Sequence, residues 1–298
     1  MPSPARRLLI AAMLLNAALA TLKAVVGHVA GSGALVADAA HSAADMLAAG
    51  TIYLGLRLAH RPPDECHPYG HGKIEQLISL GIGVLLILVG FEVARDNLHV
   101  LWRGRSPAPA QTALWVAAAC LIAKETLFRR MLATGKRLSS PALVADAWHQ
   151  RSDALLSTGA LLGVAGARAG YPALDPLAGC LLGLVLSGTG ASLAYRAACQ
   201  LTDRQDRHLA EAVRQASRMA PGVTQVRQVR IRRYGSKAFV DLIIDVTGNL
   251  TVDEGHRVAE MVRQRVIDDL PQVQEVLVHV DPHRASNDQT PEASLPQG

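Results

Sequence analysis

Two stretches of this sequence carry the same polar pattern inside apolar surroundings. Residues 34–45 read ALVADAAHSAAD and residues 142–153 read ALVADAWHQRSD, so eight of the twelve positions match. The spacing places His41 with Asp45, and His149 with Asp153, on one face of a helix. Asp and His are costly in hydrocarbon and usually face a cavity or bind something there. Two such edges facing each other would supply two imidazoles and two carboxylates, a tetrahedral set suited to zinc.

The carboxylates just upstream of each histidine have a less direct interpretation. Asp38 and Asp146 each lie three residues before the histidine, near the same helix face, and could orient the imidazole through a hydrogen bond. Asn16, in the first apolar segment, could equally line the site or pack between helices. A shared helix-packing motif would explain the small residues of the repeat. It would not explain the repetition of two carboxylates and an imidazole in lipid.

The loop at residues 62–75 reads PPDECHPYGHGKIE and contains a second candidate group. Its Asp64, His67 and His71 have the spacing of metal ligands in a rigid turn, and Cys66 could compete as a softer ligand. The alternative is an ordinary loop with two exposed histidines. In that case the neighbouring charges would form a network that ties the loop to its surroundings, with Glu65, Lys73 and Glu75 as its members.

The last third of the chain offers a third candidate group. His279 and Asp281 stand two residues apart in a predicted strand and therefore point to one side of it. His256 in a predicted helix and Asp241 in another predicted strand could join them. Because surface histidines are common, this group is weaker than the other two; we predict a cytoplasmic metal site from these four residues.

Six apolar segments must position these residues: 8–29, 33–58, 77–101, 110–132, 142–167 and 174–195. Each is close to the ~20 residues that a helix needs to cross a bilayer. Arg and Lys follow the second and fourth segments, and Arg6 and Arg7 precede the first, so the positive-inside rule places both termini in the cytoplasm. The first segment continues past Lys23, which favours a span over a cleaved signal peptide.

The composition changes after Leu201. The pattern predicts a helix at 206–219, strands at 223–233 and 238–246, a helix at 253–270 entered through a Thr251/Asp253 cap, and a strand at 274–280. This α-β-β-α-β order suits a small α+β layer. We therefore expect a membrane domain at 1–200, a cytoplasmic domain at 201–283 and a disordered polar tail at 284–298.

The composition of the 298 residues excludes some other classes. Half of them are hydrophobic, the net charge is only +5, and aromatic residues make up 4%, which is a poor match to nucleic-acid binding. The four cysteines show no C-x-x-C spacing, so no disulfide framework is expected. The expected surroundings are a lipid bilayer rather than a nucleic acid.

The motifs together resemble the cation diffusion facilitator family. The resemblance covers nearly the whole chain, from Leu8 to Pro282. The resemblance rests on the paired His/Asp motifs, the H-P-Y-G-H-G-K-x-E loop, Asp175-Pro176 and the terminal H-V-D-P. It implies a homodimeric α-helical membrane protein with six transmembrane helices and a metallochaperone-like α+β cytoplasmic domain. It also implies export of divalent metal from the cytoplasm in exchange for protons.

Carried onto this sequence, the resemblance implies a transport site at His41, Asp45, His149 and Asp153, with a loop site at Asp64, His67 and His71. In the cytoplasmic domain, His256, His279 and Asp281 match positions that bind regulatory metal in some members. The sequence departs from the best-known zinc and iron exporters at Arg227 and Ile243, where they carry further histidines. A two-metal regulatory cluster is therefore doubtful, and a single site using Asp241 is the alternative.

His/Asp motifs in both helices suggest zinc within this family, and imidazole is a better ligand for zinc than for manganese. The expected function is proton-coupled Zn²⁺ efflux by alternating access, in a multi-pass protein of a bacterial inner membrane. The alternatives are export of Fe²⁺, Cd²⁺ or Co²⁺, or a metal-sensing scaffold that does not transport. An enzyme is not expected, because H-E-x-x-H is absent and four protein ligands leave no open metal position.

Overall fold

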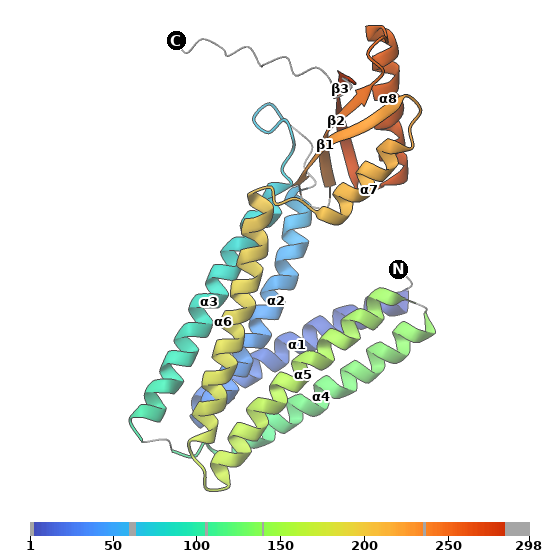
Figure 1. Ribbon diagram of the computed structural model, residues 1–298. Coiled ribbons are helices and arrows are strands. Elements are labelled where there is room, and N and C mark those ends of the chain that lie inside the picture. The colour runs from blue at the N-terminus through green and yellow to red at the C-terminus, as the bar shows by residue number, and fades with distance from the viewer. Residues whose placement is uncertain (1–2, 60–63, 105–106, 139, 235–236, 284–298) are drawn as a thin grey trace, which may run out of the picture. The chain divides into compact units, whose positions relative to one another are not determined.

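The computed structural model (Figure 1) describes residues 3–59, 64–104, 107–138, 140–234 and 237–283. The chain divides into two compact units, one formed by residues 1–55 and 78–197, the other by residues 56–77 and 198–298. Each unit is described by itself below. The predicted disordered tail at 284–298 and residues 235–236, between the first two predicted strands, lie outside the described residues.

Six long helices confirm the predicted helical membrane domain. They are α1 (Ser3–Ala30), α2 (Gly33–Ala59), α3 (Lys73–Trp102), α4 (Gln111–Arg137), α5 (Pro141–Arg168) and α6 (Leu174–Leu201). Among the described residues, length and mean hydropathy alone identify three of them as membrane spans: Leu8–Ala30, Lys73–Trp102 and Leu174–Leu201. The mean hydropathy of α4 and α5 is lowered by charged residues, such as Lys124 and Arg129 on α4 and Arg151 on α5.

The helices of the first unit form two groups (Figure 1). Helices α1, α4 and α5 lie together, as do α2, α3 and α6. Glycines allow the second group to pack closely: a Cβ placed on Gly90 of α3 would come within 2.6 Å of the Gly183 carbonyl oxygen on α6. Small residues at helix contacts are typical of membrane bundles. A shared apolar cluster containing Leu35, Ala160 and Leu182 joins the two groups.

The buried carboxylate of Asp175, at the start of α6, fixes the start of α2. Its Oδ1 accepts a hydrogen bond from the Ser32 hydroxyl at 2.6 Å, and its Oδ2 accepts one from the Gly33 backbone N–H at 2.7 Å. A carboxylate is favourable there because the first N–H groups of a helix have no partner within the helix. Asp175 therefore anchors the helix that carries His41 and Asp45.

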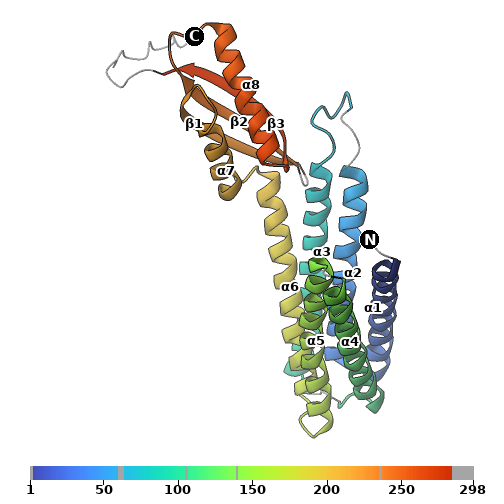
Figure 2. The same ribbon diagram turned by 90° about the vertical axis from the view of Figure 1, so that its right-hand side faces the viewer.

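The second unit contains the predicted α-β-β-α-β order: α7 (Arg207–Arg218), β1 (Val223–Tyr234), β2 (Lys237–Val246), α8 (Val252–Asp269) and β3 (Val273–Pro282). The sheet order is β1-β2-β3, with β1 antiparallel and β3 parallel to β2. Alternate residues of β2, from Val240 to Val246, are buried in the core that α7 and α8 cover (Figure 2).

The two helices of the second unit begin at residues that can accept hydrogen bonds from free backbone N–H groups. Asp206 caps α7 by accepting from the Leu209 N–H. Thr251 caps α8 as predicted, but the acidic residue paired with it is Glu254 and not Asp253. A reciprocal capping box requires the acidic residue at the third helical position, which Glu254 occupies.

Candidate metal centre

Three of the four residues predicted for the transport site lie together between α2 and α5. Ligand atoms of His41, Asp45 and Asp153 all lie within 4.8 Å of one another. The His41 Nε2 and Asp45 Oδ2 atoms are 3.7 Å apart. His41 is 6% exposed and Asp153 7% exposed, so both are withdrawn from the surface of the helix bundle, while Asp45 is half-buried.

Two atoms of this group are buried without a hydrogen-bond partner among the described residues. They are the Nδ1 of His41 and the Oδ2 of Asp45. A buried polar atom without a partner is costly, and native structures usually satisfy such atoms with protein, water or an ion. An imidazole nitrogen and carboxylate oxygens are also the donor set that zinc accepts. The group therefore fits a divalent cation carried as substrate.

His149, the fourth predicted ligand, is exposed and lies outside the three-residue group. It is still near, because it interacts electrostatically with both Asp45 and Asp153. Helices α2 and α5 run in opposite directions, with Asp38 beside Ser157 and His41 grouped with Asp153. His149 is consequently level with Asp45, and its side chain would have to turn inward to join the group.

Asp38 has different partners from those predicted. Its Oδ2 lies 2.7 Å from the ammonium of Lys23 on α1, and its Oδ1 accepts a hydrogen bond from Ser157 at 2.9 Å. Both carboxylate oxygens are therefore engaged away from the His41 ring, and this finding replaces the predicted hydrogen bond to the imidazole. Asp146 is half-buried and interacts electrostatically with His149.

Lys23, for which no role was predicted, is completely buried. Its ammonium also donates hydrogen bonds to Ser157 at 3.1 Å and to Ser42 at 3.3 Å. The resulting network joins α1, α2 and α5 one helical turn from the metal group. The signal in the sequence was a lysine inside an apolar span, since intramembrane lysines nearly always pair with an acid. A second lysine, Lys124 of α4, is 3% exposed and interacts electrostatically with Asp38, Asp45 and Asp153.

Asn16, whose role the sequence left open, makes a packing contact. Its side-chain Nδ2 donates a hydrogen bond to the side-chain Oε1 of Gln150 at 3.3 Å, which links α1 to α5. Cys120 is buried and Cys66 exposed; both are free thiols.

The loop group predicted from sequence also comes together. Asp64 Oδ1 lies 3.1 Å from His67 Nδ1, and Asp64 Oδ2 lies 3.3 Å from His71 Nε2. The His71 Nδ1 is buried without a hydrogen-bond partner among the described residues. Although desolvation acts in the opposite direction, hydrogen bonds from the His67 backbone and ring hold the pKa of Asp64 below its usual range. Asp64 is thus ready to bind a cation at neutral pH.

Aromatic and charged contacts attach this loop to the sheet of the second unit. Tyr69 stacks on Tyr234 with ring centroids 5.9 Å apart, and it meets Phe239 edge-on at 5.8 Å. The Lys73 ammonium lies 3.2 Å from Asp203. Lys73, one member of the charge network considered as the alternative, therefore forms an ion pair in the same loop as the candidate ligand group.

The four residues predicted for the cytoplasmic site are not brought into one group within the described part of the chain. Asp241 pairs with Arg232 at 2.8 Å. In the register of β2 and β3, Asp241 lies beside Leu277, whereas Asp281 lies beside Asp245. Asp241 and Asp245 are four positions apart on β2, a distance of about 13 Å along the strand. The pattern alone could not show which acid of β2 faces Asp281.

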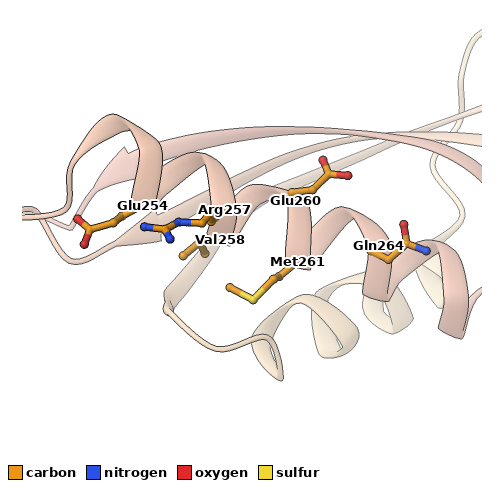
Figure 3. Close-up of a pocket in the computed structure, with 6 residues that line it drawn as sticks. All are labelled: Glu254, Arg257, Val258, Glu260, Met261 and Gln264. Carbon is orange, nitrogen blue, oxygen red and sulfur yellow. The ribbon is translucent and has the colours of Figure 1, made fainter.

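His256 lies on α8, whose outer face lines a shallow pocket (Figure 3). The lining residues are Glu254, Arg257, Val258, Glu260, Met261 and Gln264. Figure 3 shows these side chains along the length of the helix, with Glu260 directed away from Met261. None of them belongs to a predicted ligand group, so the pocket does not complete a metal site.

Two family descriptions match this chain. The description "Cation efflux transmembrane domain" matches residues 9–202, and "Cation efflux protein, cytoplasmic domain" matches residues 206–283. The chain belongs to the cation efflux family. Members of this family are membrane transporters of divalent metal cations and not enzymes, which agrees with the predicted cation diffusion facilitator resemblance.

Several relatives of this cation efflux protein match over most of its length. Metal tolerance protein C1 of Arabidopsis thaliana is 35% identical over 89% of this chain, which spans 59% of that longer protein. Magnetosome protein MamB of Magnetospirillum gryphiswaldense is 32% identical, over 89% of each chain. The manganese efflux system protein MneS of Bacillus subtilis is 28% identical, over 83% of this chain and 86% of its own.

Among solved structures, "MamM-CTD 215-293" is 25% identical and covers 26% of this chain and 96% of its own, with a TM-score of 0.25. A nickel form of the MamM CTD is 23% identical and covers 26% of this chain, with a TM-score of 0.26.

Proposed function

We propose that this cation efflux protein exports Zn²⁺ from the cytoplasm in exchange for protons. The observation that carries the proposal is the buried group of His41, Asp45 and Asp153, whose ligand atoms lie within 4.8 Å of one another. His149 would complete a set of two histidines and two carboxylates by turning inward. Family membership supports transport of a divalent metal, while the choice of zinc rests on the donor atoms.

The proposed coupling follows from the ligands themselves. Zinc binds to neutral imidazole and to ionised carboxylate, so a proton on His41, Asp45 or Asp153 competes with the metal. In the state open to the cytoplasm, the deprotonated group takes up zinc. In the state open to the other side, protons displace zinc and return with the empty site. Histidine suits this exchange because its reference pKa of about 6.5 is close to physiological pH.

Other metals remain as alternative substrates within the same mechanism. Imidazole also binds Fe²⁺, Co²⁺ and Cd²⁺, and the relative MneS is named for manganese efflux. A group containing histidine favours zinc over manganese, because manganese prefers oxygen ligands. We further propose that two copies associate through the cytoplasmic domain and that both termini lie in the cytoplasm of a bacterial cell. The group at Asp64, His67 and His71 is proposed as a second, cytoplasm-facing metal site.

The experiment is zinc uptake into proteoliposomes containing the full-length protein. Wild type and Ser152→Ala should transport at similar rates, because Ser152 is exposed on α5 and its hydroxyl donates a hydrogen bond to the Trp148 carbonyl oxygen of the same helix. Asp153→Ala, one residue further along, should abolish uptake. Wild-type protein that binds zinc but transports none of Zn²⁺, Fe²⁺, Cd²⁺ or Co²⁺ would overturn the transporter proposal in favour of a metal-sensing scaffold.

A further inference from the structure

Two carboxylates lie side by side at one end of the cytoplasmic sheet. The parallel register of β2 and β3 pairs Asp245 with Asp281. Like charges at directly paired positions destabilise a sheet. Asp245 is only 4% exposed, so water screens this repulsion poorly. Such a pair requires a cation between or beside the two side chains.

Arg227 of β1 supplies that cation. Its Nη1 donates a hydrogen bond to Asp281 Oδ2 at 2.9 Å, and its Nη2 lies 2.8 Å from Asp245 Oδ1. One guanidinium therefore bridges acids from two different strands. The contact with Asp245 is an ion pair without hydrogen-bond geometry, because the Oδ1 atom has no hydrogen-bond partner among the described residues.

A strand irregularity explains how Arg227 reaches both acids. The pairing of β1 with β2 shifts register between Val226 and Gln228, which leaves Arg227 as the extra residue. An extra residue of this kind bends the strand and redirects its side chain. The bulge thus appears at the position whose side chain must reach across β2 to β3.

Two histidines adjoin the same acids. His279 Nε2 lies 3.1 Å from Asp281 Oδ1, and His283 Nδ1 lies 3.5 Å from Asp245 Oδ2. The guanidinium thus adjoins two His–Asp pairs, and these four side chains do not converge to within 4.8 Å of one another as the other two candidate groups do. Removal of the guanidinium would leave two carboxylates and two imidazoles to close on the vacated position. This is a complete donor set for a tetrahedral divalent metal.

We propose that Arg227 is a tethered cation that takes the place of a metal ion in the cytoplasmic domain. Asp245, Asp281, His279 and His283 bind a divalent metal there only when the guanidinium is removed. The conformation of this domain is therefore set by the chain itself and does not respond to metal at this position. The proposal concerns only the second unit and does not depend on transport through the membrane domain.

The test counts zinc ions bound to the full-length protein in detergent by equilibrium dialysis. All variants are made in the Asp153→Ala background, so that a change in the count does not come from the transport group. Arg227→Ala should bind one more zinc per chain than its parent, and Arg227→Ala/Asp245→Asn should lose that ion again. Asp245→Asn alone should leave the parent count unchanged, because the parent holds no metal at this position.

Arg232→Ala is the matched control. Arg232 lies on the same strand and pairs with Asp241 of β2, but the position beside Asp241 on β3 is Leu277. Its removal leaves Asp241 without its arginine, but no second acid lies beside Asp241, so no zinc should be gained. The proposal is overturned if Asp245→Asn alone removes a zinc ion, or if Arg227→Ala gains none while its hydrogen exchange shows a native sheet. If Arg227→Ala does not fold, the Asp245→Asn count still decides.

Discussion

Asp153 and His149 stand one helical turn apart on α5, yet their surroundings differ. Asp153 is buried and belongs to the group with His41 and Asp45, whereas His149 is exposed beside it. The structure therefore ranks two residues that the sequence motif treats as equal. Asp153 already lies with the other two candidate ligands, whereas His149 requires a change of side-chain conformation to join them.

This ranking predicts different costs for the two alanine substitutions. Asp153→Ala should abolish zinc binding at the membrane group, because a carboxylate ligand is lost. His149→Ala should weaken binding less, by roughly 10-fold to 100-fold, the range typical of residues that support a ligand, because turning the ring inward offsets part of what its bond to zinc contributes. Isothermal titration with zinc at pH 7 measures both. Equal losses for the two variants would show that His149 is already a full ligand.

For individual residues, the sequence predicted the proximity of His41, Asp45 and Asp153 but not the contacts of the neighbouring side chains. The repeat placed His41, Asp45 and Asp153 correctly because residues four apart share a helix face. It could not show that Asp38 pairs with Lys23, since that contact joins α1 to α2 through the packing of the bundle. The acid of β2 that faces Asp281 was missed for a similar reason, because strand register is not visible in one strand's pattern.

Among the helices, the ion pair of Lys23 and Asp38 fixes α1 against α2 and α5. Both side chains are buried, with 0% and 2% of their side-chain area exposed. Buried pairs add little net stability, but removing one partner leaves an uncompensated charge. The pair therefore acts as a constraint on helix position next to the metal group.

Lys23→Met should destabilise the protein by about 3–5 kcal/mol, because the buried Asp38 carboxylate would lose the ammonium that lies 2.7 Å from it. The double variant Lys23→Met/Asp38→Asn should recover most of that loss, because no unpaired charge remains. Thermal unfolding in detergent gives the order of stability of wild type, Lys23→Met and the double variant. A double variant as unstable as Lys23→Met would contradict the pairing.

In the cytoplasmic domain, α7 depends on Asp206 at its N-cap. The Leu209 backbone N–H, and with it the Arg233 guanidinium, hold the pKa of Asp206 below its usual range. A carboxylate whose folded pKa is lowered contributes stability above its unfolded pKa of about 3.9. That contribution is lost as the pH falls through the lower folded value.

Asp206→Asn keeps the capping oxygen and removes the charge, so it should cost α7 about 0.5–1 kcal/mol at pH 7. The difference from wild type should shrink below about pH 4 and vanish once Asp206 is protonated in the folded state. Hydrogen exchange of the α7 amides measures this difference in stability, once the protection factors are corrected for the intrinsic pH dependence of exchange. A difference that stays constant down to pH 2 would rule out the charge as its cause.

The order of elements was predictable because hydrophobic periodicity changes from continuous apolar runs to period-2 strands after Leu201. The predicted six helices and the α-β-β-α-β order are both present. The boundaries of β1 and β3 differ from the prediction by one or two residues. The irregularity at Arg227 was not predictable, because a bulge depends on the partner strand.

For the whole molecule, the two units carry different chemistry. The first holds the buried group that we propose to carry zinc, and the second holds the loop group and the arginine-bridged acids. Family membership makes the chain a membrane transporter of divalent cations. The central claim is that zinc and protons use the same ligands in turn and therefore move in opposite directions.

The most direct measurement follows zinc and internal pH together in proteoliposomes, with fluorescent reporters for each inside the vesicles. An outward proton gradient should drive zinc inward through wild type, and the entry of zinc should be accompanied by loss of protons from the interior. Reversing the gradient should reverse the zinc flux, and Asp153→Ala should show neither. Zinc flux that ignores the gradient and moves no protons would contradict the account, even if Asp153→Ala blocked it.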